Sequence, residues 1–150
     1  MEKENHTFER IIKLTGREPS ECKCQRCQQQ CKTPCLGTPD DILNLLNAGY
    51  RKQLSFTVWA VGLYLGVYPN IIPMIQAEKT SNGCAFLKDG LCSIHHTGLK
   101  PTEGKLSHHT ITAENLDFKQ SLAWNVAKEW LSEDNDQTIA HIVQLMLDLD

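Results

Sequence analysis

The chain has 150 residues, of which 41% are hydrophobic and 22% charged, and its formal net charge is −3. A chain of this length buries about 70% of the surface that it exposes when unfolded, so it does not need disulfides to fold. The slightly acidic balance excludes a general electrostatic attraction to nucleic acid. We therefore expect a single domain over residues 1–150, with no nucleic-acid partner.

The first residues, from Met1 to Asn5, are polar and lack the apolar run of a signal peptide. A cytoplasmic location follows as the default. Thiols stay reduced in the cytosol, so densely spaced cysteines indicate metal binding or catalysis there. If the chain is exported by another route, disulfides remain possible. An odd number of cysteines cannot, however, all pair within one chain.

One helix is predicted before the first cysteine. Phe8, Ile11 and Ile12 have the spacing of one helical face, so residues 5–15 form a short amphipathic helix that ends at Gly16. The cysteine segment that follows, residues 20–36, is polar and has no periodicity. We expect it to be a loop organised by what it binds.

A second helix begins after the cysteine segment. The sequence from Thr38 to Asp41 (TPDD) combines a capping residue, a proline for the first helical position and two carboxylates that complement the helix dipole. This helix buries Ile42, Leu45 and Leu46, and it ends at Gly49.

The middle of the chain contains the strand candidates. Residues 53–77 carry no charge, but Pro69 and Pro73 interrupt them and the strongly apolar part, residues 58–67, is too short to span a bilayer. We expect buried core segments and no membrane partner. Residues 54–67 are compatible with strand or helix, and both stay open. The remaining expected elements are a strand at 71–77, a hairpin formed by 84–87 and 91–95 around Lys88-Asp89-Gly90, and a loop at 97–110.

Two helices are predicted at the end of the chain. Phe118, Leu122, Val126 and Trp130 recur at every fourth position. A second helical face, with spacing i, i+3, i+4, i+7 and i+8, is formed by Ile139, Ile142, Val143, Met146 and Leu147. We expect the two helices to be antiparallel and to cover a small sheet. The expected fold is therefore α+β: a small antiparallel sheet with a cysteine-rich metal loop, an N-terminal helix and two C-terminal helices. The metal-binding region covers about 20–105, and the helical region about 112–150.

Five of the seven cysteines lie between positions 22 and 35. A tetrahedral zinc site takes four Cys or His ligands, and a cubane iron–sulfur cluster takes four thiolates. The pair Cys24-x2-Cys27 allows one tight turn to present two sulfurs to one metal. The candidate metal ligands are Cys22, Cys24, Cys27, Cys31, Cys35, Cys84 and Cys92. Either three of them are spare or two metals share bridging thiolates.

The hairpin turn has two possible registers. If Asp89-Gly90 is a two-residue turn, Leu87 faces Cys92, and Cys84 and Cys92 point to opposite faces of the hairpin. His95 would then be the partner of Cys84, and Cys92 would be a core residue. If Gly90 instead forms a bulge, Phe86 faces Cys92 and both cysteines share one face. We favour the shared-face register, because a common metal site requires it.

Two segments carry a resemblance to a known family. Residues 24–42 (CQRCQQQCKTPCLGTPDDI) and 83–95 (GCAFLKDGLCSIH) resemble the bacterial cysteine-cluster proteins described as zinc- or iron-chelating domains. That family combines C-x2-C-x2-C-C, a T-P-x-D helix start, C-x-F-L-x2-G-x-C-x-I-Y/H and a closing R-P-x2-C-R. The likeness covers roughly residues 22–105. It implies a bound metal, in a pathway that the family leaves undefined.

This chain departs from the family pattern at two places. Its cysteine spacing is x2-x3-x3, and the closing cysteine falls on Gly104. One expected ligand is therefore missing, while Cys22 and Cys35 are extra. His95 is a candidate to complete the coordination shell, whereas His108 and His109 fit a solvated loop better.

The expected function is that of a cysteine-ligated metal-binding protein, acting as a structural or interaction module with an unidentified protein partner. Zinc is slightly favoured over an iron–sulfur cluster, because its d10 centre tolerates irregular loops. The alternative is an iron–sulfur redox protein that transfers electrons or assists an oxidoreductase. No cysteine is marked as a nucleophile, so no catalytic residue is assigned and the question of enzymatic activity stays open.

Overall fold

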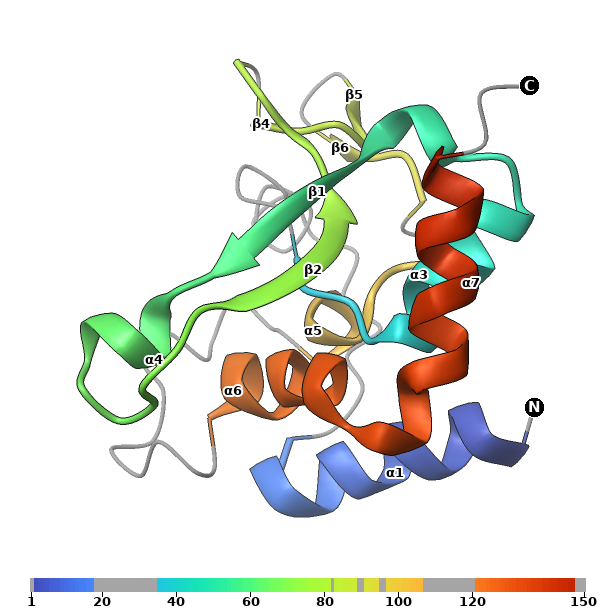
Figure 1. Ribbon diagram of the computed structural model, residues 1–150. Helices are drawn as coiled ribbons and strands as arrows, with labels where there is room; N and C mark the ends of the chain where they lie inside the picture. The colour runs from blue at the N-terminus through green and yellow to red at the C-terminus, as the bar shows by residue number, and fades with distance from the viewer. Residues whose placement is uncertain are drawn as a thin grey trace.

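The computed structural model describes residues 2–17, 35–81, 83–88, 91–94, 97–106 and 121–147. The fold is α+β, as the sequence predicts: helices surround a two-stranded antiparallel sheet (Figure 1). Of the predicted cysteine-rich loop, only its end from Cys35 onward belongs to the described residues. Within the described ranges, no helix combines the length and apolarity that crossing a membrane requires.

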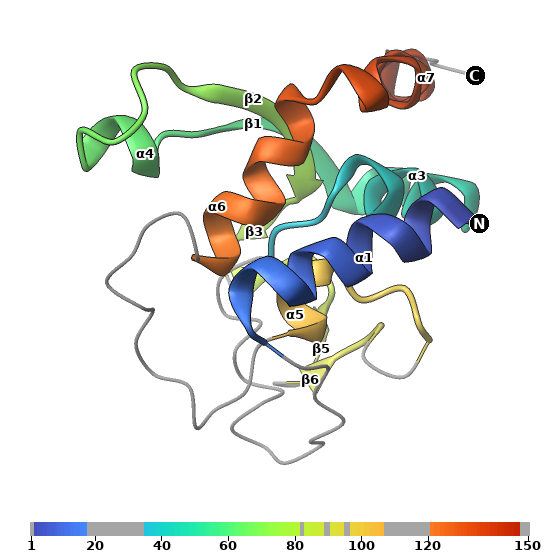
Figure 2. The same ribbon diagram turned by 90° about the horizontal axis from the view of Figure 1, so that it is seen from below.

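The N-terminal helix α1 spans Glu2–Thr15 and confirms the amphipathic pattern. Ile11 is fully buried and packs with Leu106, Leu122 and Val126 in a small cluster of its own. α1 therefore lies against α6 (Leu122–Ala127), an arrangement that Figure 2 shows from below.

Helix α3 spans Pro39–Asn47 and begins as predicted. The Thr38 hydroxyl accepts a hydrogen bond from the Asp41 backbone N–H, and the Asp41 carboxylate accepts one from the Thr38 backbone N–H, which together form a capping box. Beyond its end, Gly49 has φ of 94°, a conformation that glycine adopts without strain.

The main hairpin resolves the open assignment of residues 54–67. After a 3-10 turn at Arg51–Gln53 (η2), strand β1 spans Leu54–Trp59 and pairs antiparallel with β2, Ile72–Ala77. One helical turn, α4 (Val61–Tyr64), lies in the connection. The segment is thus strand first and helix second.

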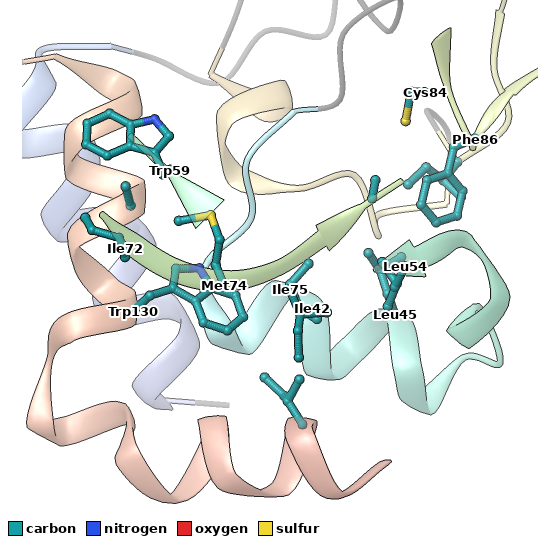
Figure 3. Packing of buried hydrophobic residues seen from close by; sticks show 14 residues of the cluster. Ile42, Leu45, Leu54, Trp59, Ile72, Met74, Ile75, Cys84, Phe86 and Trp130 are labelled. Atoms are coloured by element: carbon teal, nitrogen blue, oxygen red, sulfur yellow. The ribbon is translucent and has the colours of Figure 1, made fainter. Parts of the chain in front are cut away.

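The hairpin is buried only along part of its length. Every β2 residue except Pro73 is buried, and Figure 3 shows Ile72, Met74 and Ile75 among the core side chains. The expectation of buried core segments is therefore confirmed for β2. It is wrong for the middle of β1, where Phe56 and Val58 are exposed. It is also wrong for the connection, where the exposed apolar side chains are Val61, Leu63, Tyr64, Leu65, Val67 and Ile71.

Five short elements follow β2 in the described part of the chain. Strand β3 (Lys79–Thr80) pairs with β4 (Gly83–Cys84), and β5 (Leu87–Lys88) pairs with β6 (Leu91–Cys92). The segment expected to be a loop contains one helical turn, α5, at Thr102–Lys105.

The C-terminal helices differ from the prediction in their arrangement. α6 ends at Ala127, two 3-10 segments follow at Lys128–Leu131 (η4) and Glu133–Asn135 (η5), and α7 spans Asp136–Leu147. α7 packs against α3 rather than against α6, and α6 and α7 run in clearly different directions in Figure 1. The expected antiparallel pair is wrong because the tight η4 and η5 turns redirect the chain, and Trp130 of η4 packs into the core beside β2.

Candidate metal centre

Two of the predicted ligands, Cys35 and Cys84, lie at one small cavity although they are far apart in the sequence. Both are thiols; Cys84 is buried and Cys35 is half-buried. The cavity has a volume of about 10 Å³, close to the smallest that accommodates one water molecule. The other residues that line it are Ala77, Phe86, Ile94, Lys100 and Pro101.

Cys35 is positioned through hydrogen bonds to the two residues that follow it. The Leu36 N–H donates to Glu103 Oε1 at 2.9 Å, and the Glu103 N–H donates to the Leu36 carbonyl at 3.0 Å. These reciprocal bonds join the cysteine segment to α5. Figure 2 shows α5 beside the segment that leads into α3.

Gly37 is bonded to the core by two further side chains. Its N–H donates to Gln76 Oε1 at 2.7 Å, and its carbonyl accepts bonds from Gln76 Nε2 at 3.0 Å and from Trp130 Nε1 at 2.8 Å. Gln76 is only 3% exposed, and a buried amide must find such partners to offset the loss of water. The backbone beside Cys35 is therefore fixed to β2 and η4.

Asp41 holds α5, the element that carries Gly104, against the start of α3. Its Oδ2 atom accepts bonds from the Thr38 N–H at 2.9 Å, the Thr102 N–H at 2.8 Å and the Thr102 hydroxyl at 2.5 Å. One carboxylate thus joins the start of α3 to the start of α5. The segment that carries Lys100 and Gly104 is in consequence held close to Cys35.

Cys84 is positioned by the β3–β4 pair and by the turn after it. Gly83 has φ of 110° and lies opposite Thr80 in the ladder. The Ala85 N–H donates to the Glu78 carbonyl at 2.8 Å. Next to Cys84, the Phe86 ring meets Tyr50 edge-on with centroids 5.4 Å apart. In Figure 3, Cys84 and Phe86 lie at the end of the core away from Trp59.

The hairpin register corrects the shared-face prediction. Leu87 pairs with Cys92 and Lys88 with Leu91, which is the register of a two-residue turn. The favoured pairing of Phe86 with Cys92 is wrong. A turn at Ala85 and Phe86 also separates β4 from β5, so the alternation of side chains does not carry from Cys84 to Cys92. No residue of this segment predicts the turn, because the composition is that of an ordinary strand.

Lys100 is the member of the cavity wall to which the sequence assigned no role. Its side chain is only 8% exposed, which is unusual because buried lysines carry a large desolvation cost. It lies around Gly104: a Cβ atom built on Gly104 would be 2.7 Å from Lys100 Cε and 3.0 Å from Cys35 Sγ. The position at which the resemblance expects a closing cysteine is therefore next to the Cys35 thiol.

The other predicted ligands are not placed. Cys22, Cys24, Cys27 and Cys31 lie outside the described residues, as do His95, His108 and His109; of Cys92, only the backbone in β6 is described. Among the residues that the structure describes, no group of three or more His, Cys, Asp or Glu side chains could hold a metal ion. The described part of the candidate centre is thus a pair of thiols, whereas a tetrahedral zinc site takes four Cys or His donors.

The thiol pair fits a metal by donor type. Thiolates are the ligands of structural zinc and of iron–sulfur clusters. The cavity between Cys35 and Cys84 has the scale of a single small group. A second, larger hollow of about 410 Å³ lies between β1, β2 and α7. The described residues that line it are apolar apart from Thr57, so they supply no metal ligand or acid–base group.

A scan against protein-family models and searches of curated proteins and of solved structures each find no match to this chain.

Proposed function

We propose that the protein binds a metal through cysteine thiolates, with Cys35 and Cys84 as two of the ligands and zinc as the metal. The observation that supports the proposal is the meeting of these two thiols, from remote parts of the chain, at one cavity of about 10 Å³. Zinc takes four such ligands, and the cysteines upstream of Cys35 are the natural source of the rest.

Metal binding of this kind would add stability to the fold. A ligand that binds only the folded chain shifts the folding equilibrium by its binding free energy. Cys35 lies next to the start of α3 and Cys84 at the end of β4. A bound ion would connect these two parts, so the proposed role is a structural or interaction module in the cytoplasm, where thiols stay reduced. An unidentified protein partner belongs to the same proposal.

The test is anaerobic purification followed by elemental analysis of the wild type and of Cys35→Ser and Cys84→Ser. Loss of a residue that hydrogen-bonds to a metal ligand lowers metal affinity roughly 10- to 100-fold. We expect each substitution to lower the affinity by more than this, because it removes a ligand itself. The melting temperature of both variants should fall as well. A chelator should bring the melting temperature of the wild type close to that of Cys35→Ser, because neither protein then holds the metal.

Phe86→Leu is the matched control, because Phe86 lines the same cavity without offering a ligand. It should lower the melting temperature and keep the metal content. If Cys35→Ser and Cys84→Ser leave both metal content and melting temperature unchanged, the proposal is wrong. If the purified protein is brown and dithionite bleaches it, the bound group is an iron–sulfur cluster and not zinc, which favours the redox alternative.

A further inference from the structure

The β1–β2 hairpin exposes a set of large apolar side chains, which we call the hairpin patch: Phe56, Val58, Val61, Leu63, Tyr64, Leu65, Val67 and Ile71. Their exposed fractions add to about four and a half complete side chains, or roughly 600 Å² of apolar surface. The largest apolar patch on a typical monomer covers about 300–600 Å² and is often functional. In Figures 1 and 2, α4 lies at the periphery of the molecule, so the patch is accessible to another molecule.

The backbone of β1 has a side with which no described strand pairs, since β2 is its neighbour in the described sheet. Backbone groups of an antiparallel strand point alternately toward and away from the neighbouring strand. The Glu78 N–H donates to the Gln53 carbonyl at 2.8 Å, so Gln53 and every second residue after it point toward β2. Phe56 and Val58 therefore direct their N–H and C=O groups away from β2.

Pro73 supports this assignment and distinguishes the two edges of the hairpin. It lies opposite Val58 in the ladder, and its missing N–H costs no ladder bond when that position points outward. Proline and charged side chains protect edge strands from pairing with other chains. β2 has Pro73 at its outer edge, whereas Leu54–Trp59 contains neither a proline nor a charge. β1 is thus the edge that is open to another strand.

A second copy of this chain fits the hairpin patch by charge and by area. A two-fold interface brings a patch against itself, so any charge on it would face a like charge, and residues 53–77 carry none. An anionic lipid surface would instead need Lys or Arg within the patch. A standard interface covers about 800 Å² per partner, of which just over half, about 450 Å², is apolar. The patch exceeds this area, so Tyr64 at its tip can stay in solvent.

We propose that two copies of the chain associate through their β1 edges about a two-fold axis at Thr57, forming a four-stranded antiparallel sheet in the order β2-β1-β1-β2. This inference goes beyond the proposed function and does not depend on it. The axis at Thr57 places Phe56 opposite Val58 of the second copy, so their outward backbone groups bond to each other and their side chains form an aromatic–β-branched pair. An axis at Phe56 would place Val58 opposite Leu54, which is only 5% exposed and supplies no cross-strand contact.

The first experiment measures the mass of the protein by sedimentation in a reducing buffer, which prevents disulfides between copies. At about 0.1 mM, the wild type should sediment at twice the monomer mass of 17.0 kDa. Thr57→Lys places two like charges opposite each other and should weaken association at least about tenfold. Thr57→Glu should do the same. An equimolar mixture of the two variants should restore the dimer, because opposite charges then meet.

A crosslink tests the register independently. Residue 57 faces its own copy as a non-hydrogen-bonded pair, with Cα atoms about 4.5 Å apart, which lies within disulfide reach. Mild oxidation of Thr57→Cys should therefore give a bond between residues 57 of the two copies, which peptide mass spectrometry detects. Ser55→Cys is the matched control on the same strand. Its copy lies four residues away along the partner strand, about 13 Å, so no bond between residues 55 should form.

The outcomes decide the proposal. Restoration of the dimer in the Thr57→Lys and Thr57→Glu mixture, with the bond between residues 57, supports it. If the wild type sediments as a monomer, the dimer is wrong; binding of that monomer to phosphatidylcholine vesicles would assign the hairpin patch to a lipid surface. If Thr57→Lys remains dimeric and Thr57→Cys gives no bond between its copies, the chains meet through another face and the β1 edge proposal is wrong.

Discussion

The two ends of the β1–β2 hairpin have similar uncharged sequences and opposite surroundings. At the end near Ala77, the strand is buried and the Gln76 amide is bonded on both sides to Gly37. At the other end, the connection around α4 exposes its apolar side chains, and Tyr64 is 93% exposed. The comparison teaches that absence of charge does not identify core. Among the bonds described, those that join the hairpin to the remote Gly37 lie at the buried end.

The largest effect should come from removing the amide at the buried end. Gln76→Leu leaves the buried Gly37 N–H without its partner, and we expect a loss of about 2–3 kcal/mol in the free energy of unfolding. Urea denaturation measures it. Gln53→Leu, at the half-buried start of the same hairpin, is the matched control and should stay within about 0.5 kcal/mol of wild type. Equal losses in the two variants would contradict the special role of the Gly37 bonds.

A smaller effect should follow from changing Asp41. Asp41→Asn weakens three bonds that join the starts of α3 and α5, because bonds to a charged acceptor are stronger than bonds to a neutral one. We expect a loss of about 1–2 kcal/mol, measured by thermal or urea unfolding. Asp136→Asn removes an exposed carboxylate from the first turn of α7 and so controls for the helix dipole alone, with a loss of at most about 1 kcal/mol. Asp41 would have no bridging role if the two losses were equal.

The smallest effect should be found at the exposed end of the hairpin. Tyr64→Ser should change the free energy of unfolding by no more than about 0.5 kcal/mol, because the ring is almost fully exposed. Tyr50→Ser is its counterpart near the cavity, where the ring meets Phe86 edge-on; it should cost at least about 1 kcal/mol. If Tyr64→Ser proves as costly as Tyr50→Ser, the contrast between the two ends is wrong.

Local signals predicted some elements well. Four consecutive residues, from Thr38 to Asp41, determine the start of α3, because their capping hydrogen bonds form within one turn. The periodicity of Phe8 and Ile11 sufficed for α1 in the same way. Both are short-range effects that do not depend on the rest of the chain.

The arrangement of the centre could not be predicted in this way. The sequence identified Cys35 and Cys84 as candidate ligands, and the structure brings them to one cavity. Lys100 carried no signal, because its burial depends on α5 being held by Asp41 and Glu103. The direction of α7 likewise depends on two 3-10 turns that no periodic pattern marks.

The bond from Trp130 to Gly37 has an optical consequence. The indole N–H ends on a carbonyl only two positions along the chain from Cys35, and ultraviolet emission of tryptophan depends on the polarity around that ring. Any displacement of the thiol-bearing segment alters this environment. Trp130 is therefore the one of the three tryptophans whose emission reports on the start of α3, once Trp59 and Trp124 are replaced by phenylalanine.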